Sequence, residues 1–397
     1  MSRLHSFIGV LTFLSMLLLG CQEKNVLNEG IFEIIESDSG KVQSQKLHPI
    51  VERMNALKIP GVSIAIIDDF KINNLIALGE SDSLNSVTKN TIFQAASVSK
   101  YVTAIIVHQL ISQGLLDLDT DVNQYLKSWK VPKNDFNQDT PITLRLLLSH
   151  QSGLPSTNFD FDKTQGVPTL AQILNADSPA INEPAIPIAI PGSRWSYSNI
   201  GYALIQQILE DVTAKSFQQI AKETLFVPLQ MSSSTFQYPL PPNFENTEAK
   251  PHDKFGQLKP PQLELPAKAQ GGLLTTPRDL GKLTIEIMKA YHNDSKIFSK
   301  ETALRLIHNE RKLPFTFYNQ KAYMGLGVLL IGENKNIAFL HNGYNSPGSV
   351  CIVIGFPEVG KGAVIAANSA NGEQLYLEII VTLAHNLNWP NGQFFKQ

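Results

Sequence analysis

The sequence predicts a mixed α/β (α+β) fold in which one antiparallel sheet is assembled from both ends of the chain. Two strand-like segments lie near the amino end and four near the carboxyl end, each short, apolar and bounded by turn residues. The long stretch between them has helical patterns joined by proline-rich connections. We therefore expect this middle part to form a second, helical lobe beside the sheet.

Length and charge limit the classes of function. The 397-residue chain is 43% hydrophobic and 17% charged, enough to bury a large core. Its formal net charge of -2 provides no basic surface, so no nucleic-acid partner is expected. The nine histidines and two cysteines form no cluster at metal-ligand spacing, so no metal site is expected.

The amino-terminal segment is typical of a bacterial lipoprotein leader. Residues 1–20 combine a short basic start with an apolar block that is too short to span a bilayer. Leu18-Leu19-Gly20-Cys21 resembles a lipobox, so Cys21 is expected to carry a lipid that anchors the protein to a membrane of the bacterial envelope. Gln22 after it favours the outer membrane, facing the periplasm. An ordinary signal peptide with an incidental cysteine is the alternative.

The amino-terminal elements are predicted from turn-forming residues and from the alternation of apolar and polar residues. The polar stretch 21–45 is interpreted as a flexible tether. A helix over 47–58 ends before Pro60-Gly61, and two strands, over 61–69 and 71–80, are joined by a tight turn near Asp68 and Asp69. From residue 93 to about 270 the pattern is mostly helical and no strand is convincing.

The carboxyl-terminal part begins with a helix marked by Thr276, Pro277 and Asp279, a capping box with proline at the first helical position. Four strands and a final amphipathic helix are then predicted at 323–332, 336–343, 350–356, 362–368 and 373–387. The expected folded domain is 46–392, with a sheet lobe formed by 46–95 and 275–392 and a helical lobe formed by 96–274.

Ser97 and Lys100 form an S-x-x-K pair ahead of a long apolar segment. At i and i+3 their side chains share one helix face, one turn apart. A lysine can take a serine's proton only if burial or nearby cations suppress its own charge, and the apolar residues behind Lys100 supply burial. Ser97 is therefore a candidate nucleophile and Lys100 a candidate base. Ser86 and Lys89 repeat the spacing in a polar loop and are interpreted as surface residues.

Tyr197-Ser198-Asn199 opens a strongly apolar helical segment. A tyrosine and an amide two residues apart at a helix entrance can both point toward a site on the other lobe. The alternative is structural, with Tyr197 a packed aromatic and Asn199 an N-cap. Tyr291 and Asn293 repeat the spacing where a helix ends among polar residues.

His341-Asn342-Gly343 ends a predicted strand. A glycine there allows close backbone approach, and the next amide, from Tyr344, can face a reacting carbonyl. Lys254 and Gly256 imitate the spacing, but the proline-rich sequence after them is incompatible with a central strand.

Together, in this order, the three motifs resemble those of the serine beta-lactamase and penicillin-binding-protein superfamily. The chain is similar in particular to the branch with a tyrosine motif: class C beta-lactamases, D,D-peptidases and beta-lactamase-like esterases. The resemblance covers roughly residues 46–390. It implies a beta-lactamase/transpeptidase-like fold, an antiparallel sheet flanked by helices plus an all-α lobe, with the active site between them. His150, in a linking segment of the family, is expected to be structural.

The resemblance also implies roles for the motif residues. Ser97 would be acylated while Lys100 and Tyr197 shuttle its proton, and Asn199 would hydrogen-bond the substrate. The amides of Ser97 and Tyr344 would form the oxyanion hole, and no metal or organic cofactor is needed. The expected catalytic residues are Ser97, Lys100, Tyr197 and His341, and the expected substrate-binding residues are Asn199, Asn342, Gly343 and Tyr344.

One departure affects the expected substrate. His341 and Asn342 stand where most beta-lactamases have lysine and a hydroxyl residue, although some peptidases and esterases of the family have histidine. Histidine is mostly neutral at pH 7 and suits an anionic drug less well than lysine. We therefore expect a serine hydrolase that acts through an acyl-enzyme on a small ester, amide or peptidoglycan-like peptide. A D,D-carboxypeptidase or weak beta-lactamase, and a penicillin-recognising binding or sensor module without turnover, are the alternatives.

Overall fold

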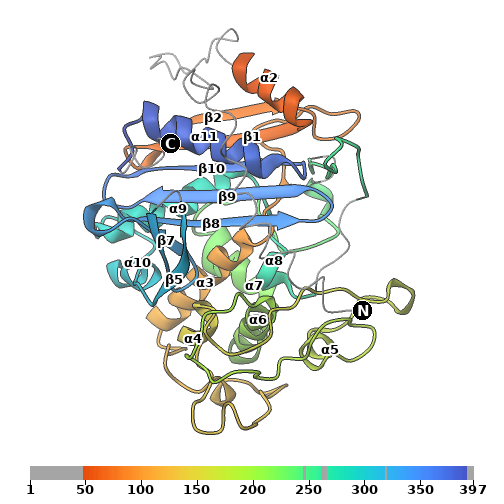
Figure 1. The fold of residues 1–397 in the computed structure, drawn as a ribbon, viewed down its shortest axis with the longest axis vertical. Helices are drawn as coiled ribbons and strands as arrows, with labels where there is room; N and C mark the ends of the chain where they lie inside the picture. The colour runs from red at the N-terminus through yellow and green to blue at the C-terminus, as the bar shows by residue number, and fades with distance from the viewer. Residues whose placement is uncertain (1–47, 245–246, 261–265, 318–319, 391–397) are drawn as a thin grey trace.

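The computed structural model describes residues 48–244, 247–260, 266–317 and 320–390, and its centre is an antiparallel sheet (Figure 1). The eight strands have the order β2-β1-β10-β9-β8-β7-β6-β5. Two strands come from the amino-terminal part, β1 (Gly61–Asp68) and β2 (Lys71–Gly79). Six follow the helical part: β5 (Arg311–Phe317), β6 (Gln320–Met324), β7 (Leu329–Ile331), β8 (Ala338–Asn345), β9 (Ser349–Phe356) and β10 (Lys361–Ala367). The prediction of one sheet assembled from both chain ends is confirmed.

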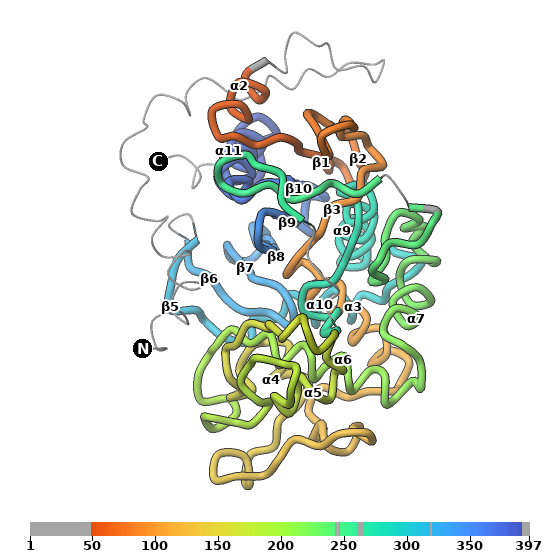
Figure 2. The backbone as a smooth tube through the Cα atoms, turned by 90° about the vertical axis from the view of Figure 1, so that its right-hand side faces the viewer, coloured from red at the N-terminus to blue at the C-terminus, as the bar shows by residue number. Residues whose placement is uncertain are grey.

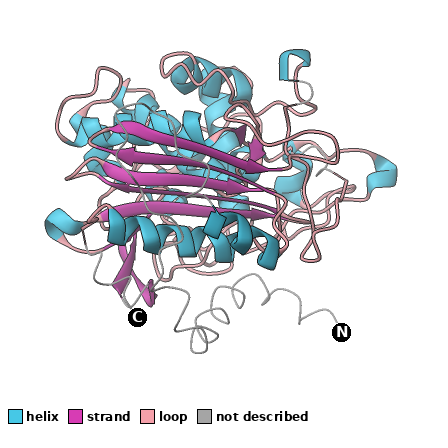
Figure 3. Cartoon of the chain, turned by 90° about the horizontal axis from the view of Figure 1, so that it is seen from above, coloured by secondary structure: helices cyan, strands magenta, loops and turns pink. Residues whose placement is uncertain are grey.

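The sheet is buried on both faces because its central strands carry apolar side chains to each side. In β1, Ile64 and Ile66 pack in the core shared with α2 (His48–Leu57) and α11 (Gly372–Asn386). Ala65 and Ile67 point to the opposite core, which α9 (Pro277–Tyr291) covers. Figure 3 shows the strands between these two helical layers.

The middle of the chain forms the helical part, whose helices α4, α5 and α6 lie together at one end of the molecule (Figure 2). Its elements are β3 (Phe93–Gln94), α3 (Val98–Ser112), α4 (Leu144–Leu148), α5 (Leu170–Asn175), α6 (Asn199–Thr213), α7 (Phe217–Ala221), α8 (Lys268–Gly271) and β4 (Leu274–Thr275). Short 3₁₀ turns occur at Val122–Gln124, Lys163–Gln165, Pro242–Phe244 and Asn334–Asn336, and a π-helical turn at Lys222–Phe226. The helix α3 reaches from this part toward the sheet and contacts β8 and β9.

Several predicted elements are wrong in detail. Residues 323–332 are not one strand, because β6 ends at Met324 and a turn with Gly327 at φ 109° precedes β7. The strand β5 had no predicted counterpart, since its side chains are mostly polar or exposed and it contains Pro314. The helix α10 (Lys300–Leu306) was also not predicted, being only seven residues long. β3 lies in the region predicted to lack strands, where two residues give no periodic signal.

The predicted leader 1–20, the lipidation residue Cys21 and the tether 21–45 lie outside the described residues. Among the helices of the described ranges, none combines the length and the apolar character needed to cross a bilayer.

Candidate active site

Ser97 lies where the chain turns from β3 into α3. Ala96 before it has a φ of 48°, in the left-handed region that non-glycine residues rarely occupy. Ser97 is the N-cap residue of α3, but its side chain makes no capping hydrogen bond. Strained backbone of this kind is concentrated at functional sites, and here it leaves the Ser97 hydroxyl to contact residues from other elements.

Lys100 is fully buried, as predicted, one turn into α3. Its Nζ lies 3.1 Å from Ser97 Oγ and donates to the carbonyl oxygen of Gln270 in α8 at 2.6 Å. Burial lowers the pKa of Lys100 well below its ordinary value near 10.5. A neutral amine has a lone pair that can accept a proton, so the lowered pKa favours the form of Lys100 that a base requires.

Tyr197 approaches Ser97 from the segment that leads into α6. Its hydroxyl donates to Ser97 Oγ at 2.9 Å, and its ring lies 4.9 Å from Lys100 Nζ. Burial raises the pKa of Tyr197 above its ordinary value, so the phenol keeps its proton at neutral pH. Ser97 Oγ is therefore within hydrogen-bond distance of both an amine and a phenol.

The strand β8 brings its glycine against the backbone of Ser97. A Cβ added to Gly343 would lie 2.4 Å from the Ser97 nitrogen and 2.8 Å from the Ala95 carbonyl oxygen. Only a residue without a side chain permits this approach, as the sequence predicted. The three predicted motifs, far apart in the sequence, thus meet around one hydroxyl.

His341 shares the sheet face of Gly343 and is 6% exposed. Its Nδ1 lies 2.8 Å from the Asn342 carbonyl oxygen. Burial, with the nearby Lys100 as a second cause, lowers the pKa of His341 to about 3. His341 is therefore neutral at pH 7, which removes the fixed cation that a lysine would supply.

Asn342 and Tyr344 lie on the other face of β8. The Asn342 amide donates to the Tyr376 hydroxyl of α11 at 3.2 Å, and that hydroxyl donates to Glu373 at 3.1 Å. The Tyr344 side chain is 45% exposed. The roles predicted for these two residues in substrate binding remain predictions, and for Tyr344 the predicted group is its backbone amide.

Asn199 is the first residue of α6, and the N-cap is Ser198, whose Oγ accepts from the Gly201 amide at 3.1 Å. The alternative reading of Asn199 as the N-cap is therefore wrong. Its Nδ2 donates to the Thr157 carbonyl oxygen at 3.2 Å and to Asn158 at 3.3 Å. Its Oδ1 is buried and has no hydrogen-bond partner among the described residues.

Backbone groups complete the arrangement, and the sequence did not identify them. Gln270 holds Lys100 through its carbonyl oxygen, and Thr157 holds Asn199 in the same way. Because every residue type offers this acceptor, no side-chain motif marks such a contact.

The second S-x-x-K pair in the sequence lies on the surface, as predicted: Ser86 and Lys89 are exposed.

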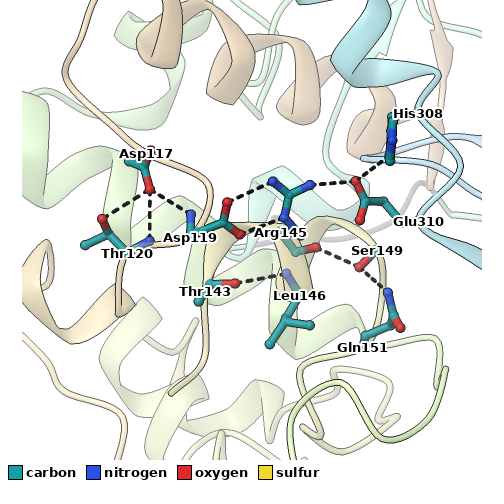
Figure 4. A network of polar contacts seen from close by, with 10 residues as sticks. All are labelled: Asp117, Asp119, Thr120, Thr143, Arg145, Leu146, Ser149, Gln151, His308 and Glu310. Carbon is teal, nitrogen blue, oxygen red and sulfur yellow. Dashed lines mark hydrogen bonds and ion pairs between the residues drawn. The ribbon is translucent and has the colours of Figure 1, made fainter. Parts of the chain in front are cut away.

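An ion-pair network joins the helical part to the sheet near the site (Figure 4). Arg145 of α4 donates to both carboxylate oxygens of Asp119, at 2.7 and 2.8 Å, and to Glu310, just before β5, at 2.7 Å. Asp119 has a lowered pKa because Arg145 donates to its carboxylate. The network holds α4 through Arg145, and the chain continues from α4 to His150.

No group of three or more His, Cys, Asp or Glu side chains is arranged to hold a metal ion within the part of the chain that the structure describes.

Comparison with known proteins decides the family. The family model described as beta-lactamase matches residues 49–384. The chain belongs to the beta-lactamase family. A penicillin-binding protein homologue from Pyrococcus abyssi, described as octameric, has a similar structure, with a TM-score of 0.73 and 27% identity over 86% of this chain and 76% of that one. The predicted beta-lactamase/transpeptidase-like fold is thus confirmed.

Two curated relatives of this beta-lactamase family member match in part. Penicillin-binding protein 4 of Amycolatopsis lactamdurans is 31% identical over 189 residues, 46% of this chain and 47% of the relative. An N-acetylmuramyl-L-alanine amidase of Bacillus subtilis is 26% identical over 249 residues, 59% of this chain and 56% of the relative. The match therefore spans about half the length of each curated relative.

Proposed function

We propose that the protein is a serine hydrolase that acts through an acyl-enzyme on a small ester or amide. The observation that carries the proposal is the position of Ser97 Oγ, in a partly exposed residue, 3.1 Å from a buried amine and 2.9 Å from a phenol. Membership of the beta-lactamase family supports it.

Acylation follows from the protonation states of the three groups. Lys100 Nζ takes the Ser97 proton as Oγ bonds to the substrate carbonyl carbon, and the negative charge on the carbonyl oxygen faces the amides of Ser97 and Tyr344. When the bond to the leaving group breaks, Tyr197 gives its proton to the departing oxygen or nitrogen and recovers one from Lys100. Water then attacks the acyl carbon and returns the Ser97 hydroxyl and the free acid.

The neutral state of His341 favours substrates without an obligatory carboxylate beside the reacting bond. A buried neutral imidazole can orient a polar group but offers an anion no fixed countercharge. We therefore propose an ester, a simple amide or a peptide as the substrate class, with beta-lactam turnover slow. The Asn199 Oδ1, a buried acceptor with no partner in the described part of the chain, suits an N–H on the acyl side of an amide or peptide substrate.

The test is acylation and turnover in the same preparation. A fluorophosphonate probe is expected to label wild type and not Ser97→Ala, and p-nitrophenyl butyrate, a D-Ala-D-Ala peptide and nitrocefin are compared for steady-state turnover. Labelling of Ser97→Ala at the wild-type rate would contradict the proposal. A stoichiometric burst with every substrate, without a steady state, would favour the acylated sensor.

A further inference from the structure

His150 lies in the turn that follows α4, directly behind Tyr197. It is 2% exposed and has a φ of 57°. The turn is fixed on both sides: Ser149 Oγ donates to the Arg145 carbonyl oxygen at 2.7 Å, and Arg311 of β5 donates to Gln151 Oε1 at 2.8 Å. His150 therefore belongs to a rigid connection between the helical part and the sheet.

His150 holds the backbone on each side of Tyr197. Its carbonyl oxygen accepts from the Ser196 amide at 2.8 Å, and its Nδ1 accepts from the Ser198 amide at 3.2 Å. Its ring also packs on the Tyr197 ring, with centroids 4.4 Å apart and planes at 39°. Three separate contacts from one residue thus fix the position of the Tyr197 ring.

We infer that His150 is a positioning residue that holds the Tyr197 hydroxyl at Ser97 Oγ. This inference rests on the proposed function, in which Tyr197 moves the proton. A displacement of about 1 Å between reacting groups can reduce a rate about a hundredfold, so a side chain that fixes Tyr197 contributes to the rate without touching the substrate.

The protonation state of His150 agrees with this role. To accept from the Ser198 amide, Nδ1 must carry no proton, so the neutral ring bears its hydrogen on Nε2. Burial, with the nearby Lys100 and His341 as further causes, lowers the pKa of His150 well below its ordinary value. Nε2 has no hydrogen-bond partner among the described residues, so the polar contact of the ring is the one to the Ser198 amide.

The competing explanation is that His150 only fills space. The two explanations differ in what a replacement must retain. Asparagine tolerates a positive φ and places its Oδ1 near the position of Nδ1, whereas alanine lacks the acceptor and is strained at this φ. If His150 acts through the Ser198 amide, His150→Asn retains the position of Tyr197 and His150→Ala does not.

The test measures the second-order rate constant of fluorophosphonate labelling in single and double variants. Tyr197→Phe, which removes only the hydroxyl, is expected to lower this constant about a hundredfold. We expect His150→Ala to lower it at least tenfold and His150→Asn by less than threefold. In the Tyr197→Phe background, His150→Ala is expected to cost less than twofold, because no hydroxyl remains to be positioned.

A matched control removes another buried imidazole. His108 of α3 is also fully buried, and its Nε2 lies 3.1 Å from the Leu326 carbonyl oxygen. Whatever His108→Ala costs in labelling, that cost is expected to be the same with and without the Tyr197 hydroxyl.

The outcomes separate this inference from the proposed function. Suppose that wild type is labelled at Ser97, and that the decrease in rate constant in the double variant equals the product of the decreases in His150→Ala and Tyr197→Phe. His150 then has only a structural role and the inference is overturned. The inference is also overturned if His150→Asn lowers the labelling rate constant as much as His150→Ala does. If His150→Ala does not fold, a tenfold or larger decrease of this constant in folded His150→Asn overturns it. If Ser97 is not labelled in wild type, the proposed function itself fails.

Discussion

Replacing Gly343 by alanine tests the closest contact in the candidate site. The new Cβ would lie 2.4 Å from the Ser97 nitrogen, whereas ordinary contacts of a Cβ begin at 3.4 Å, so β8 and the start of α3 must separate by about 1 Å. The Ala95 carbonyl oxygen at 2.8 Å and the Ala96 Cβ at 2.9 Å block movement to the side. The separation displaces the Ser97 amide from that of Tyr344, and loss of one oxyanion donor costs about 10²- to 10³-fold in rate.

We therefore expect Gly343→Ala to lower the fluorophosphonate labelling rate at least a hundredfold. Overpacking of this size typically costs about 1–3 kcal/mol of stability, so unfolding in urea is measured in parallel to show that the variant is folded. Gly201→Ala is the matched control: in α6 its Cβ would meet its nearest atoms at an ordinary 3.5 Å, and alanine favours helix. A folded Gly343→Ala protein labelled within threefold of wild type would refute the close approach of β8 to Ser97.

Three further changes test the electrostatics of the site. Because burial lowers the pKa of Lys100, the unfolded chain binds one more proton between that lowered pKa and about 10.5, so this group makes the free energy of unfolding rise with pH across this window. Lys100→Met is expected to reduce the slope by up to about 1.4 kcal/mol per pH unit in urea unfolding within this window, and exposed Lys89→Met is expected to leave it unchanged. Since the pKa of His341 is about 3, His341 is expected not to titrate between pH 5 and 8. The pH profiles of the labelling rate of wild type and of His341→Gln are therefore expected to have the same shape in this range. An inflection that is present in wild type and absent in His341→Gln would contradict this. His341→Lys is expected to raise the rate of acylation by nitrocefin relative to a neutral ester at least tenfold, and an unchanged ratio would count against the missing cation as the cause.

The motifs of the site could be predicted because each is tied to a local start or end of an element. Ser97 and Lys100 meet because i and i+3 share a helix face, and the apolar run that follows Lys100 buries it. Gly343 was identifiable because a glycine near the end of a buried strand indicates close approach. In each case neighbours in the sequence determine the geometry, so a single sequence contains the information.

The missed elements are those whose stability comes from the rest of the fold. Among the described residues, the strand β5 pairs only with β6, at the edge of the sheet, and its alternating pattern is interrupted by Pro314. The pairing of β3 with β4 joins Phe93 to Thr275, residues that no local pattern relates. Short elements of this kind form because longer ones hold their ends together, and this information is not local.

The orientation of side chains along β8 shows the same limit at the level of single residues. The motif His341-Asn342-Gly343 is continuous in the sequence, but successive side chains of a strand point to opposite faces. His341 and Gly343 therefore face Lys100 and Ser97, and the Asn342 amide contacts Tyr376 of α11. Period-two alternation predicts that the side chains of the motif point to two different faces of the sheet. Only the packing of both faces reveals which of these side chains lie near Ser97.

In the proposed mechanism, Lys100 can act as a base because burial alone lowers its pKa. A second lysine at position 341 would favour the neutral amine by like-charge repulsion, but the neutral His341 supplies no such charge, and burial is the cause of the lowered pKa of Lys100. The rings of Tyr197 and Tyr202 have their centroids 4.9 and 5.6 Å from Lys100 Nζ and shield it from water. The two rings therefore contribute to the burial that lowers the pKa of Lys100, and the proposed role of His150 concerns only the position of the Tyr197 hydroxyl.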